Sequence, residues 1–140
     1  MNYKVVYFSK TGNSKRVAEK IGDKLSCEVT EITDNQDWKG VLGFLKGGYY
    51  AMTKKNVEIK INKKSTDADE IIVVSPLWAS GVAPAIKSFL ETTKLDKVHL
   101  VVTSTGSKVK EREGFKSVSD VVKKNNDEDA VIDNLIKSLV

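Results

Sequence analysis

YKVVYFSKTGNSKRVAEKI, residues Tyr3 to Ile21, runs from an apolar stretch through a short polar turn into an amphipathic segment. Lys4 to Phe8 is predicted to be a buried strand, because its apolar residues are continuous. Apolar residues then recur at helical spacing behind Asn13 and Ser14, which predicts a helix from Asn13 to about Leu25. The polar turn therefore lies where a strand becomes a helix.

This turn carries the groups that bind an anion. Ser9, Thr11 and Ser14 offer hydroxyl donors, and Gly12 allows the backbone to approach a ligand closely. The first N–H groups of the helix add a partial positive charge. The patterns G-x-x-x-x-G-K-[ST] and G-x-G-x-x-G do not occur, which favours one terminal phosphate over a triphosphate or a pyrophosphate. The alternative is an ordinary connection in which Asn13 or Ser14 only caps the helix.

The turn Ser9-Lys10-Thr11-Gly12-Asn13-Ser14 resembles the phosphate-binding loop of the flavodoxin family, whose usual pattern is [TS]-x-T-G-N-T. Only the last threonine is replaced, and serine keeps the hydroxyl. The resemblance continues over about residues 1–106, with an apolar strand and aromatic loop at Ile71 to Gly81 and a later strand that ends in Thr103-Ser104-Thr105-Gly106. It implies an α/β fold, a doubly wound parallel sheet of order 2-1-3-4-5 with helices on both faces, and flavin mononucleotide (FMN) as cofactor.

The rest of the chain alternates between strand and helix patterns, as expected for a parallel sheet that is covered on both faces. Further strands are predicted at Glu28 to Ile32, Glu70 to Ser75 and Val98 to Thr103, and further helices from Val82 or Ala83 to about Glu91 and from about Asp127 to Leu139. Two segments have patterns that do not fit one element. Trp38 to Lys55 is predicted to form a short helix followed by a loop. Phe115 to Asn125 has apolar residues at helical spacing, although the family has a fifth strand here; we favour a strand at Ser117 to Val122, with a four-stranded sheet as the alternative.

Ligands of open parallel sheets lie beyond the carboxyl ends of the strands, where the winding direction reverses. Two more loops should therefore join the phosphate turn, one after the third strand and one after the fourth. Trp78 is predicted to stack on the flavin ring, and the alternative is a core tryptophan. The predicted cofactor-binding residues are Ser9, Lys10, Thr11, Gly12, Asn13, Ser14, Pro76, Leu77, Trp78, Ala79, Ser80, Gly81, Ser104, Thr105 and Gly106.

Length and composition are consistent with this interpretation. A chain of 140 residues with 40% hydrophobic content is expected to form one domain, residues 1–140. No apolar signal segment and no run of about 18 apolar residues occurs, so we expect no membrane span and a cytoplasmic location. The single cysteine, Cys27, excludes an internal disulfide, and with His99 as the only histidine no metal site is expected. His99 is interpreted as a strand-edge residue.

The net charge of +4 separates this chain from typical flavodoxins, which are strongly acidic. The lysines are dispersed and no nucleic-acid motif is present, so nucleic acid is not an expected partner. The function expected is that of an FMN electron carrier between redox partner proteins, as a monomer or weak dimer without catalytic residues of its own. The alternatives are a small FMN-dependent NAD(P)H:quinone-type reductase and a flavodoxin-like binding module without cofactor.

Overall fold

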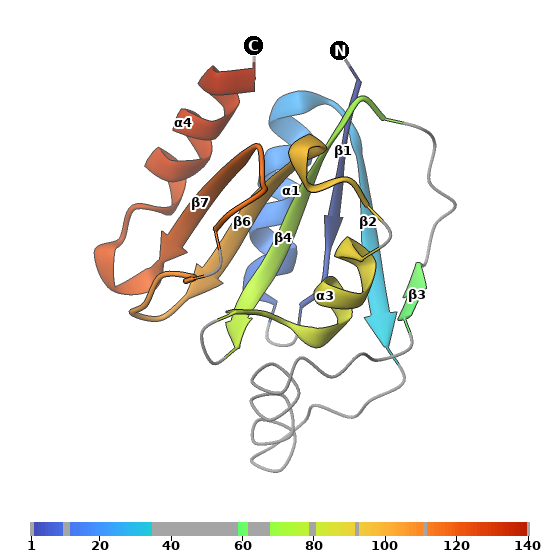
Figure 1. Ribbon diagram of the computed structural model, residues 1–140. Coiled ribbons are helices and arrows are strands. Elements are labelled where there is room, and N and C mark those ends of the chain that lie inside the picture. Colours follow the sequence, from blue (N-terminus) through green and yellow to red (C-terminus); the bar gives the residue numbers. More distant parts are fainter. Residues whose placement is uncertain are drawn as a thin grey trace.

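The computed structural model describes residues 2–9, 12–34, 59–61, 68–78, 81–91, 93–110 and 112–139. The predictions for Lys10, Thr11, Ala79, Ser80 and residues 38–55 lie outside these ranges. Figure 1 shows a twisted sheet with α1 and α4 on one face and α3 on the other. In the part of the chain described, no helix has both the length and the apolar character needed to cross a membrane.

The elements follow one another in an alternating order along the chain. The strands are β1 (Tyr3–Tyr7), β2 (Glu28–Asp34), β3 (Ile59–Ile61), β4 (Glu70–Trp78), β5 (Gly81–Val82), β6 (Val98–Ser104) and β7 (Ser117–Val122). The helices are α1 (Asn13–Leu25), α3 (Pro84–Leu90) and α4 (Glu128–Leu139), with short 3-10 turns at Leu95–Lys97 and Lys123–Asn125. The helix predicted to start at Asn13 is confirmed, and Pro84 occupies the first turn of α3, where it costs no backbone hydrogen bond.

The sheet has the order β3-β2-β1-β4-β6-β7. Its parallel strands β2, β1, β4, β6 and β7 reproduce the predicted order 2-1-3-4-5. Two short strands were not predicted from the sequence: β3, which pairs antiparallel with β2, and β5, which pairs antiparallel with β4. The doubly wound fold is thus confirmed, with one short antiparallel strand beside β2 and another beside β4.

The predicted fifth strand is present as β7, which pairs with β6 from His99 opposite Ser117 to Ser104 opposite Val122. The helical spacing of its apolar residues has a simple cause. Val118 packs against the cluster under α3, whereas Val121 packs against the cluster under α1 and α4. Residues three apart point to opposite faces of a strand, so a strand that is covered on both faces imitates a helical pattern.

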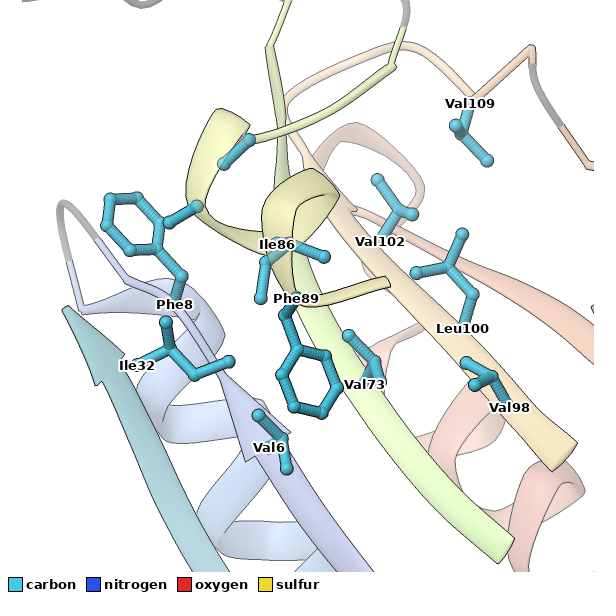
Figure 2. Packing of buried hydrophobic residues seen from close by; sticks show 12 residues of the cluster. Val6, Phe8, Ile32, Val73, Ile86, Phe89, Val98, Leu100, Val102 and Val109 are labelled. Carbon is cyan, nitrogen blue, oxygen red and sulfur yellow. The ribbon is translucent and has the colours of Figure 1, made fainter. Parts of the chain in front are cut away.

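Strand β1 shows the same two-sided burial. Val6 and Phe8 point into the cluster beneath α3, which Figure 2 shows, while Val5 and Tyr7 point into the cluster beneath α1 and α4. This alternation is the period-2 pattern of a strand with two covered faces. β1 is therefore the centre of the fold, and the turn that follows it starts from a fixed position.

The boundary of β4 differs from the prediction. We expected the strand to end at Ser75 and residues 76–81 to form a loop, but β4 continues through Pro76, Leu77 and Trp78 and then pairs back with β5. Pro76 lies opposite Thr103 of β6 in the register. Proline lowers the tendency to form a strand, but the antiparallel pairing of Leu77 with Val82 extends the ladder beyond it.

The amino edge of the sheet holds a polar cluster formed by Glu70, His99, Lys116 and Ser117. The Nε2 atom of His99 lies 2.7 Å from Oε1 of Glu70, and its Nδ1 atom lies 2.6 Å from Oγ of Ser117. The Lys116 ammonium donates to the other oxygen of Glu70. His99, the second residue of β6, lies near the end of the strand as predicted; it and Glu70 are only 4% and 6% exposed, and the buried ring bridges β4 to β7.

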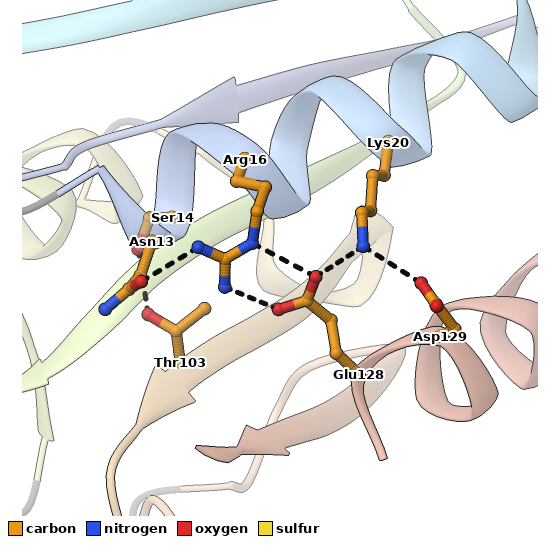
Figure 3. Close-up of polar contacts among 7 residues, drawn as sticks. All are labelled: Asn13, Ser14, Arg16, Lys20, Thr103, Glu128 and Asp129. Carbon is orange, nitrogen blue, oxygen red and sulfur yellow. Dashed lines mark hydrogen bonds and ion pairs between the residues drawn. The ribbon is translucent and has the colours of Figure 1, made fainter. Parts of the chain in front are cut away.

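Helices α1 and α4 are joined by ion pairs along their contact. Glu128 accepts hydrogen bonds from Arg16 and Lys20 at 2.6 Å each, and Lys20 also reaches Asp129 at 2.9 Å (Figure 3). Hydrogen bonding from Arg16, opposed by burial and aided by Lys20, lowers the pKa of Glu128 from 4.5 to about 2. A separate bond, from the Tyr3 hydroxyl to the Leu139 carbonyl oxygen at 2.9 Å, ties the last turn of α4 to β1.

Glu128→Gln removes the negative charge that pairs with Arg16 and Lys20, so we expect it to lower the free energy of unfolding at pH 7. The loss should be only about 1–2 kcal/mol, because both cations are partly exposed and solvent screens them. Since the folded pKa lies below the unfolded value, this contribution is present above pH 4.5 and is lost as the pH falls toward 2. Urea denaturation at several pH values measures it. Asp133→Asn is the control, because Asp133 and its partner Lys24 are 54% and 43% exposed; equal losses in both variants would contradict the prediction.

Candidate functional site

The turn after β1 brings Ser9 and Gly12 to the carboxyl edge of the sheet, at the start of α1. Gly12 has φ 96°, in the left-handed region that favours glycine, and among the described residues no heavy atom lies within 4 Å of a Cβ built there. Its N–H donates to Oγ of Ser9 at 2.9 Å. Helix α1 then begins without a side-chain cap and without an acidic residue in its first turn. A helix end of this kind attracts an anion.

The side chains of Asn13 and Ser14 are engaged with neighbouring elements. The Ser14 hydroxyl is 1% exposed and shares a hydrogen bond of 2.9 Å with the Thr103 hydroxyl at the end of β6. The Asn13 side-chain oxygen accepts from Arg16 at 2.9 Å, and all four residues are seen in Figure 3. Ser14 therefore joins the turn to β6, and Asn13 joins it to Arg16 of α1.

The ribbon formed by β4 and β5 carries the predicted ring-binding residues. Ser75 is fully buried; its hydroxyl accepts from the Ala83 N–H at 3.0 Å and donates to the Pro76 carbonyl oxygen at 2.9 Å. These bonds hold the start of α3 against the end of β4. Trp78 lies opposite Gly81 in the ribbon, so both are placed beyond the main sheet.

Trp78 is partly buried at the edge of the core. Its ring meets Phe8 edge to face, with centroids 5.6 Å apart and an interplanar angle of 86°. Phe8 itself is 6% exposed, whereas Trp78 is only half-buried against the cluster under α3. Trp78 thus packs partly on the core through Phe8, and its role beside a flavin ring stays a prediction.

The loop after β6 lies at the same edge. Ser104 donates to the Ser107 carbonyl oxygen, and the Thr105 carbonyl oxygen accepts from the Lys124 N–H at 3.0 Å. Thr105 and Gly106 are exposed. Because β1, β4 and β6 are neighbours and parallel, the structure brings the three predicted loops together at their carboxyl ends.

A cleft that the sequence analysis missed lies next to this site, between the first turns of α1 and α4. It has a volume of about 580 Å³ and a wall of mixed charge that includes Arg16, Lys20 and Glu128. The sequence held one signal for it: Arg16, Lys20 and Lys24 are spaced by four, which places a basic stripe on one face of α1.

Comparison with solved structures supports the fold. A protein from Bacteroides eggerthii assigned as a flavoprotein is 24% identical, with a TM-score of 0.75 over 99% of this chain and 98% of its own. A protein from Bacteroides uniformis that is also assigned as a flavoprotein is 18% identical, with a TM-score of 0.70. A flavoprotein from Lactobacillus acidophilus, solved in complex with FMN, is 21% identical, with a TM-score of 0.65. Each of these two matches covers 93% of this chain and 97% of the other chain. The chain therefore has the flavodoxin-like fold.

Sequence comparisons give two results. No protein-family model matches the chain. A protein-glutamate methylesterase/protein-glutamine glutaminase from Clostridium acetobutylicum is 33% identical over 99 residues, which is 69% of this chain. The chain spans about a quarter of the length of that relative.

Proposed function

We propose that this protein binds FMN, with the phosphate at the turn between β1 and α1 and the ring near Trp78. The observation that carries the proposal is the start of α1, which has an open left-handed glycine, no side-chain cap and no first-turn acid. The residues at the site fit the cofactor, because glycine at position 12 leaves open space beside the start of α1 in which a phosphate can lie. A side chain at this position would fill part of that space. The L. acidophilus protein of the same fold, crystallised with FMN, supports the same choice.

We further propose that the protein carries electrons between redox partner proteins. FMN, when bound, would supply the electron-transfer chemistry through its isoalloxazine ring. The chain's contribution is to hold the phosphate, to place an aromatic plate beside the ring and to set the local charge. The net charge of +4 favours partners with acidic surfaces, which attract a basic carrier over long distances. A small FMN-dependent reductase is the second candidate, because FMN bound at the same site could also accept electrons from NAD(P)H.

Titration of the flavin-free protein with FMN and with riboflavin tests the proposal. The two ligands share the ring and differ in the phosphate, so FMN should bind at least about tenfold more tightly, from charge-assisted hydrogen bonds of about 1.5–3 kcal/mol each. Isothermal titration calorimetry gives both constants. Equal affinities for FMN and riboflavin would contradict a phosphate site at the turn. In a separate assay, rapid oxidation of NADPH by quinone without an added reductase would favour the reductase function.

A further inference from the structure

Positive charge gathers on the two connections that leave the carboxyl ends of β6 and β7. One is the loop of residues 104–110 and the other is the turn of residues 123–126. The two are joined, because the Lys124 N–H donates to the Thr105 carbonyl oxygen at 3.0 Å. Four exposed lysines lie on them, and we call this set the basic rim: Lys108, Lys110, Lys123 and Lys124.

The basic rim differs from the other basic groups of the molecule because acidic residues do not neutralise it. Three cations of α1 pair with acids of α4, and two cations near β7 pair with acids of β7 and β4: Arg16, Lys20, Lys24, Arg112 and Lys116. No lysine of the basic rim forms an ion pair with any described residue. Its positive field is therefore open to a partner.

The basic rim also lies beside the site proposed for FMN. Lys108 and Lys110 follow the predicted cofactor residues Ser104 to Gly106 in the same loop, and Lys124 is bonded to that loop. The rate of electron transfer between proteins falls steeply with the distance between their redox centres. A partner that binds the basic rim would bring its redox centre close to the proposed flavin site, whereas one that binds the amino edge of the sheet would not.

The composition of the basic rim favours an acidic protein over a nucleic acid. Nucleic-acid surfaces commonly use arginine to read base edges and phosphates, and aromatic side chains to stack on bases. Residues 104–110 and 123–126 contain no arginine and no aromatic residue. Dispersed lysines on two loops instead give a field that steers an acidic protein surface during its approach.

We propose that the basic rim is the docking surface for an electron-transfer protein whose redox centre is surrounded by acidic residues. The proposal rests on the proposed function, because the partner must exchange electrons with FMN. In the complex one electron passes from the reduced centre of the partner to the bound flavin, and no covalent bond forms or breaks. The complex should be short-lived and sensitive to salt, because exposed ion pairs are weak and screened.

The binding of an acidic plant-type two-iron ferredoxin tests the proposal. Fluorescence anisotropy of the labelled ferredoxin gives the Kd for the FMN-loaded protein and for the flavin-free protein. Substituting Lys108→Gln together with Lys124→Gln should raise both Kd values about threefold to tenfold, as two exposed ion pairs imply. The Kd of the wild type should rise between about 0.01 and 0.2 M salt, where the Debye length falls from about 30 Å to below about 8 Å.

The matched control is Lys94→Gln together with Lys97→Gln. These lysines are also exposed and lie just before β6, at the amino edge, so the change in net charge is the same. The control should leave the Kd within about twofold of the wild-type value. In stopped-flow mixing with reduced ferredoxin at low salt, only the Lys108 and Lys124 substitutions should slow reduction of the bound flavin. Thermal unfolding of each variant confirms that the fold is intact.

The outcomes separate this proposal from the proposed function. Equal weakening by the two pairs of substitutions would overturn the docking surface, because net charge alone would then explain binding. No ferredoxin binding at about 0.01 M salt would overturn it as well, and duplex DNA that binds in its place and is lost with Lys108 and Lys124 would identify a nucleic-acid surface. Both results leave FMN binding intact, whereas failure to take up FMN overturns the proposed function itself.

Discussion

Replacing Gly12 by alanine is expected to weaken FMN binding by about tenfold to a hundredfold, the equivalent of one charge-assisted hydrogen bond of about 1.5–3 kcal/mol. The backbone at Gly12 has φ 96°, and alanine either strains that conformation or shifts it, which turns the first N–H groups of α1 away from the phosphate. The added methyl group would also enter the open space beside the turn. Riboflavin, which has no phosphate, should lose much less affinity.

Gly114→Ala is the control for backbone strain. Gly114 has φ 90° in the connection between β6 and β7, so alanine should cost a similar amount of stability there, about 1–2 kcal/mol. It should leave FMN affinity unchanged. The prediction fails if Gly12→Ala weakens FMN and riboflavin equally, because the phosphate would then not be the group that the turn recognises.

Glu70→Ala is expected to lower the free energy of unfolding by about 2–3 kcal/mol, because it leaves a buried ring nitrogen of His99 without its acceptor. The ammonium of Lys116 adds less, since that side chain is 48% exposed and screened by solvent. Urea denaturation should show a lower midpoint with an unchanged slope. FMN affinity should stay the same, because this cluster lies at the amino edge and the proposed site at the carboxyl edge.

The contribution of Glu70 should also depend on pH. Hydrogen bonding from His99, followed by that from Lys116, lowers the pKa of the Glu70 carboxyl from 4.5. Because the folded value is the lower one, the stabilisation is present above pH 4.5 and is lost as the pH falls below it. The gap between wild type and Glu70→Ala should therefore narrow in acid. Glu91→Ala, at an exposed position after α3, should show no comparable loss.

The positions of the parallel strands could be predicted from the sequence because the signals were local, whereas their order was implied by the resemblance to the flavodoxin family. Continuous apolar runs mark strands that are buried on both faces, and the turn at Ser9 to Ser14 marks the first crossover. The end of β4 could not be predicted in this way. Pro76 argues against a strand, and the pairing of β5 with Leu77 and Trp78 that extends it is a contact between segments, not a property of either one.

Only part of the candidate site could be predicted, because only part of it depends on local sequence signals. Its three loops follow from strand order alone, once the phosphate turn has been recognised. The contacts of Ser14 with Thr103 and of Trp78 with Phe8 join residues 89 and 70 positions apart, and no local pattern indicates them. The cleft between α1 and α4 depends on how two helices meet, so it appears only in three dimensions.

The contact between Phe8 and Trp78 has a consequence for selectivity. Phe8 supports the indole of Trp78, and the next residue along the chain, Ser9, accepts the Gly12 N–H in the turn proposed to hold the phosphate. The two proposed contact points for FMN are thus held by consecutive residues just after β1, one through a ring contact and the other through the turn. We expect the distance between them to vary little, so flavin analogues with a longer or shorter chain between ring and phosphate should bind more weakly than FMN.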